Sequence, residues 1–173
     1  MNENQMQHGA DWVGQDLTGM LLAEKFNGCR AYWDGATLWT RGGKAVALPA
    51  AWAAALPAMP LDGELYDGVD GLHRCATALR FGRFLPTMSL VVFDAPDADG
   101  DYAARLGTAA TAISDCTFAQ TTPLTVCRDN DQAVDLLRAV QARGGEGLMA
   151  RVPALPYRPG RTTDLLKVKR DWR

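Results

Sequence analysis

Short strand-like runs joined by tight-turn dipeptides are the feature that most constrains the fold of this chain. Residues 19–26 (GMLLAEKF) and 29–43 (CRAYWDGATLWTRGG) are rich in apolar and aromatic residues. Asn27-Gly28 and Asp34-Gly35 are dipeptides typical of hairpin turns, which predicts one turn between these runs and one inside the second. Further strand-like runs are expected at residues 59–68, 87–96, 146–152 and 163–170.

Helical patterns are fewer and irregularly placed. Residues 48–57 and 101–113 read as helices, and residues 130–145 give the clearest one, with Asp or Asn to cap its start and Gly144 to end it. Strands and helices do not alternate regularly, so a doubly wound parallel sheet is not expected. The sequence predicts an α+β fold of antiparallel sheets flanked by helices.

Composition limits the class of protein. The 173 residues are 47% hydrophobic and 22% charged, which suits one globular domain over residues 1–173. No apolar run approaches the ~20 residues of a membrane span, and the start has no secretory signal pattern. Four scattered cysteines without a CxxC pair favour a reducing, cytoplasmic environment and argue against zinc.

Charge is distributed unevenly along the chain. The net charge is −2, yet residues 141–173 carry eight basic and three acidic side chains, a balance of +5, which leaves −7 for the rest. A basic segment of this kind is either a solvated face or a binding surface for phosphates.

Polar clusters at strand ends carry the functional signal, and there is no GxxxxGK[ST] or GxGxxG phosphate loop. Lys167 and Lys169 lie on one face of a strand, where an anion between them would relieve their repulsion. Glu64 and Glu146 each lie beside a glycine, and two converging carboxylates suit Mg²⁺ bound to substrate phosphates. Each of these residues, taken alone, is better explained as a solvated strand end. Together with Lys25 they indicate a nucleoside triphosphate site in which a lysine attacks the α-phosphate.

Six segments carry a family resemblance, in the family's order. They are KFNGCR (25–30), TRGG (40–43), LDGELY (61–66), VVFDAP (91–96), GEGLMAR (145–151) and LLKVKR (165–170). The chain resembles the nucleotidyltransferase (adenylation) domain of ATP-dependent DNA ligases, a member of the covalent nucleotidyltransferase superfamily with RNA ligases and capping enzymes. CRAYWDG is especially similar to the short ligases of bacteria and phages, and the resemblance runs from about residue 11 to the end.

The resemblance implies a role for each residue toward the nucleoside. Lys25 would be the nucleophile and would form a lysyl-AMP phosphoramidate. Phe93 would stack on adenine, the backbone near Ala23 and Glu24 would contact the adenine edge, and Glu64 would contact the ribose or the metal.

The resemblance also implies how phosphates and metal are held. Arg30 and Arg41 would bind phosphates of ATP or of the DNA 5′ end, and Lys167 and Lys169 would bind the α-phosphate and the leaving pyrophosphate. Glu146, with Glu64, would help bind Mg²⁺ or Mn²⁺. The implied partner is nicked double-stranded DNA, and the implied state is a monomer.

Two departures from the family pattern stand out. Position 27 is Asn where most DNA ligases have Asp, which predicts slower chemistry because a negative charge is lost. The OB-fold domain that normally follows LLKVKR is absent from this chain, so inefficient sealing is expected; an excised domain and a natural protein without that module both fit. An RNA ligase, a GTP-dependent capping-type enzyme and a non-catalytic nucleotide- or nick-binding module are the alternatives.

Overall fold

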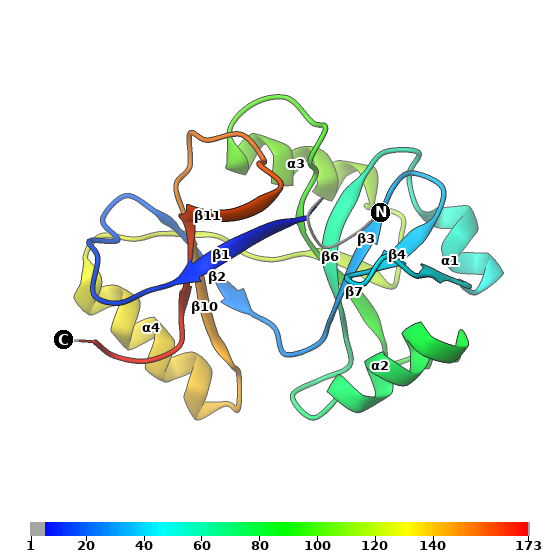
Figure 1. The fold of residues 1–173 in the computed structure, drawn as a ribbon, viewed down its shortest axis with the longest axis horizontal. Coiled ribbons are helices and arrows are strands. Elements are labelled where there is room, and N and C mark those ends of the chain that lie inside the picture. Colours follow the sequence, from blue (N-terminus) through cyan, green and yellow to red (C-terminus); the bar gives the residue numbers. More distant parts are fainter. Residues whose placement is uncertain (1–5, 173) are drawn as a thin grey trace.

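Two β-sheets lie side by side in the computed structural model, which describes residues 6–172 (Figure 1). The first sheet, sheet A, has five strands in the order β1 (Gln7–Asp11), β11 (Gly160–Val168), β10 (Gly147–Arg151), β2 (Leu21–Lys25) and β9 (Thr125–Val126). The second, sheet B, has six strands in the order β5 (Ala45–Val46), β4 (Leu38–Thr40), β3 (Cys29–Trp33), β6 (Leu61–Tyr66), β7 (Ser89–Asp94) and β8 (Ala119–Thr121).

Each sheet has its own hydrophobic core and its own helices. Helix α4 (Asn130–Ala142) packs on sheet A, where it buries Val134 and Leu137. Helices α1 (Ala50–Ala55), α2 (Leu72–Phe81) and α3 (Tyr102–Ala112) surround sheet B and its larger core. Within residues 6–172, none of these helices is long and apolar enough to cross a membrane.

The predicted α+β class is confirmed, but the sheets are mixed rather than purely antiparallel. β1 pairs with β11 in parallel, and β7 pairs with β8 in parallel. In both pairs the two strands are far apart in the sequence, so no short hairpin turn forces them to run in opposite directions.

Asn27-Gly28 does not form the predicted hairpin turn. β2 lies in sheet A and β3 lies in sheet B, so this dipeptide carries the chain from one sheet to the other. Asp34-Gly35 does form its predicted turn: it joins β3 to β4, Gly35 has φ +98°, and Asp34 Oδ1 accepts hydrogen bonds from the amides of Ala36 and Thr37.

The sequence analysis missed helix α2 and the short strands β1, β5, β8 and β9. α2 buries only three small or medium side chains, Cys75, Ala78 and Leu79, so its apolar face is narrow. The cap of α4 is Asp129, whose side chain accepts a hydrogen bond from the Gln132 amide.

Candidate active site

A cleft of about 630 Å³ lies between the two sheets and is lined by strands of both. Every site residue predicted from the sequence lines this cleft except Lys169, which contacts Glu146 of the cleft wall. The predicted residues that line the cleft are Ala23, Glu24, Lys25, Arg30, Arg41, Glu64, Phe93, Glu146 and Lys167. Residues from six separate segments therefore converge on one cavity.

Glu146 bridges two of the predicted lysines. Its Oε2 lies 2.5 Å from Lys25 Nζ and its Oε1 lies 2.7 Å from Lys169 Nζ. The strand register explains the meeting, because Gly147 on β10 pairs with Lys25 on β2, and β10 also pairs with β11. Burial acts to raise the pKa of Glu146, but hydrogen bonds from Lys169 and Lys25 outweigh it, so the pKa is lowered.

Lys167 extends the cluster of positive charge. Burial lowers its pKa, and the positive charges of Arg161, Lys169 and Lys25 lower it further. Asp11, whose Oδ1 lies 3.9 Å from Lys167 Nζ, opposes this shift, but burial and the neighbouring positive charges together outweigh it. Positive charges gathered around Lys167 in this way provide a favourable place for an anion.

Glu64 projects from β6 next to the crossover between the sheets. Its Oε1 accepts a hydrogen bond of 3.1 Å from the Gly28 amide. Burial raises the pKa of Glu64 to about 7, although Lys25 and Arg30 act in the opposite direction. Only glycine fits at position 28, because a Cβ there would lie 2.2 Å from the Leu65 carbonyl oxygen.

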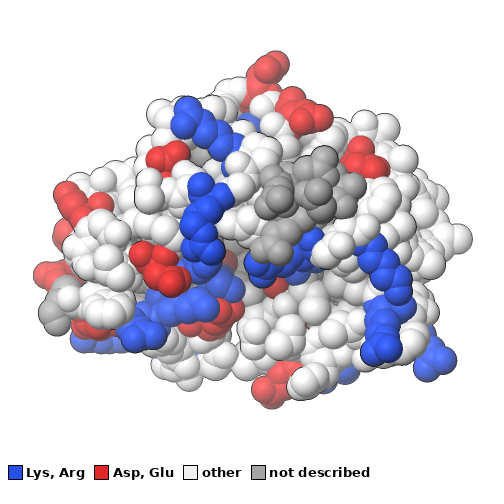
Figure 2. Space-filling view, viewed as in Figure 1, with Lys and Arg blue, Asp and Glu red and all other residues white. Residues whose placement is uncertain are grey.

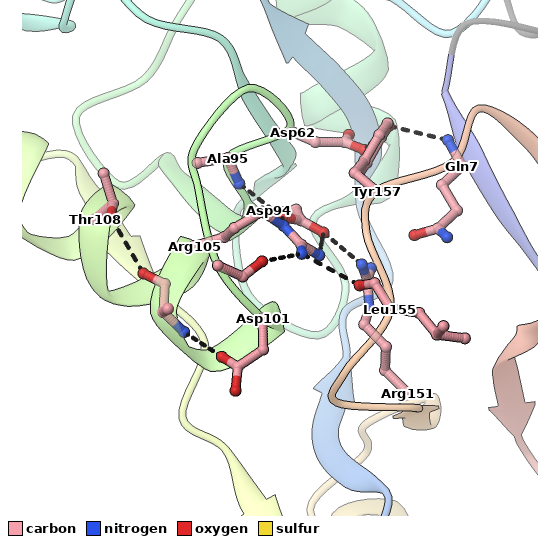
Figure 3. A network of polar contacts seen from close by, with 12 residues as sticks. Gln7, Asp62, Asp94, Ala95, Asp101, Arg105, Thr108, Arg151, Leu155 and Tyr157 are labelled. Carbon is pink, nitrogen blue, oxygen red and sulfur yellow. Dashed lines mark hydrogen bonds and ion pairs between the residues drawn. The ribbon is translucent and has the colours of Figure 1, made fainter.

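Arg30 lies against Asp62 and Phe93. Its Nε and Nη2 donate to the two oxygens of Asp62 at 2.6 and 2.5 Å, and its guanidinium lies 4.7 Å from the centre of the Phe93 ring. Arg30 Nη2 also donates to the Gln7 carbonyl of β1. Tyr157 donates to Asp62 and lies beside Gln7 (Figure 3), so this buried cluster joins the two sheets. The predicted phosphate-binding role of Arg30 stays a prediction.

A second buried network, which the sequence analysis missed, lies around Asp94 at the end of β7. Arg105 Nε donates to Asp94 Oδ1 at 2.9 Å, and Arg151 Nη1 donates to Asp94 Oδ2 (Figure 3). Arg151 comes from sheet A and lies 4.2 Å from the centre of the Tyr102 ring. An aspartate directly after the apolar run LVVF was the signal available in the sequence.

The remaining predicted residues lie at the rim and wall of the cleft. Arg41 is exposed in the turn that follows β4, and Ala23 is buried on β2 opposite Met149. Glu24 forms an ion pair with Arg143, with 2.6 Å between Oε2 and Nη2. This ion pair joins β2, which lines the cleft, to the residue that directly follows α4.

The two sheets and the cleft between them define a nucleotidyltransferase fold, which known structures share. A solved Lig E DNA ligase has a TM-score of 0.84 and 26% identity, over 95% of this chain and 68% of that one. The DNA ligase-adenylate of Chlorella virus has a TM-score of 0.80 and 20% identity, over 96% and 67%. The ATP-dependent DNA ligase of bacteriophage T7, solved with ATP, has a TM-score of 0.71 and 15% identity, over 96% and 68%.

Sequence similarity indicates the same class of proteins, the DNA ligases. The DNA ligase of Haemophilus influenzae is 30% identical over 159 residues, which are 90% of this chain and 59% of that ligase. No family model matches the chain. The chain is thus homologous to DNA ligases and has the nucleotidyltransferase fold of the ATP-dependent ones, as the six motifs predicted, while it spans about three fifths of the length of that relative.

Proposed function

We propose that this chain is the catalytic domain of an ATP-dependent DNA ligase and that Lys25 becomes adenylated. The observation that carries the proposal is the position of Lys25 Nζ in the cleft, 2.5 Å from Glu146, which also binds Lys169. Glu146 thereby gathers two lysines at one place in the cleft, where the phosphates of a nucleotide would find both cations. The similarity to DNA ligases supports the same reading.

The proposed chemistry has three steps. The deprotonated Lys25 amine attacks the α-phosphorus of ATP, a P–N bond forms, and the bond to pyrophosphate breaks. A DNA 5′-phosphate oxygen then attacks the same phosphorus, which frees the Lys25 amine and leaves AMP on the DNA end. The DNA 3′-hydroxyl finally attacks the 5′-phosphate, a phosphodiester forms, and AMP leaves.

Charge in the cleft supports the first step. Lys167 and Lys169 would stabilise the negative charge that develops on the α-phosphate and the pyrophosphate. Arg41 at the rim, together with Arg30, would bind phosphates of ATP or of the DNA end. These positive charges are in place before the reaction begins, so no free energy is spent on reorienting them. Such preorganised charge can contribute most of the stabilisation of a transition state.

The nucleoside would lie deeper in the cleft. Phe93 would stack on adenine, which requires the Arg30 guanidinium now over its ring to adjust. The backbone near Ala23 and Glu24 would contact the adenine edge, and Glu64 would contact the ribose.

The carboxylates of the cleft suit Mg²⁺ or Mn²⁺ better than a metal that needs an all-protein cage. Among residues 6–172, no group of three or more His, Cys, Asp or Glu side chains gathers in a metal-binding arrangement. Mg²⁺ commonly uses one or two carboxylates together with substrate phosphate oxygens, and Glu64 and Glu146 supply two. When bound, the ion would neutralise phosphate charge and favour the departure of pyrophosphate.

The proposed macromolecular substrate is nicked double-stranded DNA, bound by a monomer. We propose that the chain is one nucleotidyltransferase domain. Without an OB-fold domain beside it, it would still adenylate itself, at a reduced rate, and would seal nicks inefficiently. Its DNA affinity would rest on phosphate contacts and would therefore fall steeply with salt.

Intact-protein mass spectrometry after incubation with ATP and Mg²⁺ tests the proposal. We expect a mass increase of one AMP with ATP, none with GTP, and none in a Lys25→Ala variant that is folded by circular dichroism. A GMP adduct would assign a capping-type enzyme instead. ATP binding without any adduct in the wild-type protein would assign a binding module.

A further inference from the structure

Two segments of sheet B and its helices carry positive charge only. Residues 35–61 contain Arg41 and Lys44, residues 71–93 contain three arginines, and neither segment has an acidic residue. The balance of these two segments is +5 in a chain of net charge −2, so the rest of the chain carries −7. This concentration is separate from the basic segment at residues 141–173.

The end of α2 places an exposed aromatic ring among these cations. Phe81 is 59% exposed, and the guanidinium groups of Arg80 and Arg83 lie 5.0 and 5.8 Å from the centre of its ring. Gly82 ends the helix with φ +67°, which turns the chain so that Arg83 returns to the same ring. The exposed ring leaves apolar surface in contact with water. Together with the two arginines, it forms a surface suited to phosphates and to the faces of sugars or bases.

This surface connects to the cleft through the β4–β5 turn. Lys44 Nζ lies 3.5 Å from the Arg80 carbonyl oxygen, which ties the turn to the end of α2. The turn itself is closed by hydrogen bonds from the Gly43 amide to the Thr40 carbonyl and from the Lys44 amide to the Thr40 hydroxyl. Arg41 and Gly42 of the same turn line the cleft. In Figure 2, basic side chains lie at the hollow in the centre of this face, and a second group lies to the right of it, in the region where Figure 1 draws β4 and α2.

We infer that Lys44, Arg80, Phe81 and Arg83, here called the α2 patch, bind the backbone of duplex DNA beside the nick. The inference rests on the proposed function for the identity of the anion and adds the surface that receives it. The three cations contact phosphates, and Phe81 packs on a sugar or on a base exposed at the strand end. The duplex thus runs from the cleft over the β4–β5 turn to the end of α2.

Fluorescence anisotropy with a labelled nicked duplex, titrated at several salt concentrations, tests the α2 patch. An Arg80→Ser/Arg83→Ser variant is compared with Arg128→Ser/Arg138→Ser, which removes two exposed arginines from and just before α4, at the other end of the molecule (Figure 1). We expect the first variant to bind about tenfold more weakly and to lower the slope of log K against log salt by roughly 1.8, since each phosphate contact contributes ~0.9. The control variant should bind like wild type.

A Phe81→Ser variant separates the ring from the charges. Loss of a stacking contact should weaken binding at least ~5-fold, while the salt slope stays at the wild-type value because no charge is removed. Wild-type affinity and slope in both α2 variants, an equal loss in the α4 control, or absence of DNA binding by the wild-type protein would each overturn the inference.

Adenylation of Lys25, measured without DNA, distinguishes this inference from the proposed function. The α2 variants should form the AMP adduct at the wild-type rate, because none of their substituted residues lines the cleft. If the wild-type protein forms no adduct yet loses DNA affinity on substitution of the α2 patch, the proposed catalysis fails while the DNA surface stands.

Discussion

At the scale of single residues, the candidate site depends on carboxylates placed beside cations. Glu146 is shared by Lys25 and Lys169, Asp62 holds Arg30, and Glu64 lies next to Lys25 without a hydrogen bond from it among those found in the described residues. The three carboxylates therefore differ in environment although all belong to one site. These differences make residue-level predictions possible.

Glu64 should give the folded protein a distinct pH dependence. Its pKa is about 7 when folded, against an ordinary value of 4.5, so the folded state retains a proton that the unfolded chain loses. The free energy of unfolding should therefore fall as pH rises from 4.5 to 7, by on the order of 3 kcal/mol from this group, and level off above. Urea unfolding of wild type and Glu64→Gln at pH 5 and pH 8 measures it. The same pH dependence in both proteins would contradict this assignment.

Asn27 should limit the rate of adenylation. It is exposed in the crossover between β2 and β3 and lines the cleft, so Asn27→Asp restores a negative charge there without a packing change. We expect the variant to form the AMP adduct several-fold faster in Mg²⁺, by quenched-flow mass spectrometry, with an unchanged thermal midpoint. A variant that is no faster would show that the lost charge is not what limits this chain.

At the scale of elements, the passage from β2 to β3 matters most, because it creates the cleft. The chain leaves sheet A after Lys25 and enters sheet B at Cys29, within a short segment that contains Gly28. The close approach of Gly28 to Leu65 leaves no room for a side chain. The crossover is therefore a steric requirement of the fold.

Two glycine-to-alanine substitutions should have opposite effects. Gly28→Ala should lower the free energy of unfolding by roughly 1–3 kcal/mol, because its Cβ would overlap the Leu65 carbonyl. Gly107 lies at an exposed position of α3, and a Cβ added there would have no atom within 4 Å. Gly107→Ala should therefore raise the free energy of unfolding by about 0.5–1 kcal/mol through better helix propensity. Denaturant unfolding measures both, and a neutral Gly28→Ala would mean that the crossover has room to move.

At the scale of the whole molecule, two buried polar clusters connect the sheets at the cleft, which Arg30 of one cluster and Arg151 of the other line. Asp62 binds Arg30 of sheet B and Tyr157, which accepts a hydrogen bond from the Gln7 amide of sheet A. Asp94 of sheet B binds Arg151 of sheet A and Arg105 of α3. Both carboxylates are fully buried. Each has lost its hydration, and the ion pairs and hydrogen bonds of its cluster compensate for that loss.

Loss of the Asp94 charge should therefore destabilise the molecule strongly. Asp94→Asn leaves two guanidinium groups buried without their counter-charge, and removal of one partner from such a pair costs about 3–5 kcal/mol. Arg138→Ala, which breaks exposed ion pairs on α4, should leave stability nearly unchanged. Guanidinium chloride unfolding compares them. Equal midpoints for the two variants would contradict a structural role for the Asp94 network.

The sequence by itself determined the features that depend on neighbours along the chain. Alternating apolar residues and turn dipeptides fixed the β3–β4 hairpin, and the apolar spacing and caps fixed α4. The expected strand holds Lys167, which lines the cleft, but β11 ends at Val168, so Lys169 lies just beyond it. The order of the six motifs also predicted which residues would converge, although not how they would contact one another.

Only the tertiary structure decided what lies across distant parts of the chain. Asn27-Gly28 looks like a hairpin turn locally, yet β2 and β3 pair with different strands, and that choice opens the cleft. The Lys25–Glu146 contact joins residues 121 positions apart, and the Asp94–Arg151 contact joins residues 57 apart. Such contacts depend on which strands pair and which faces pack together, and that is settled by burial over the whole chain rather than by any local pattern.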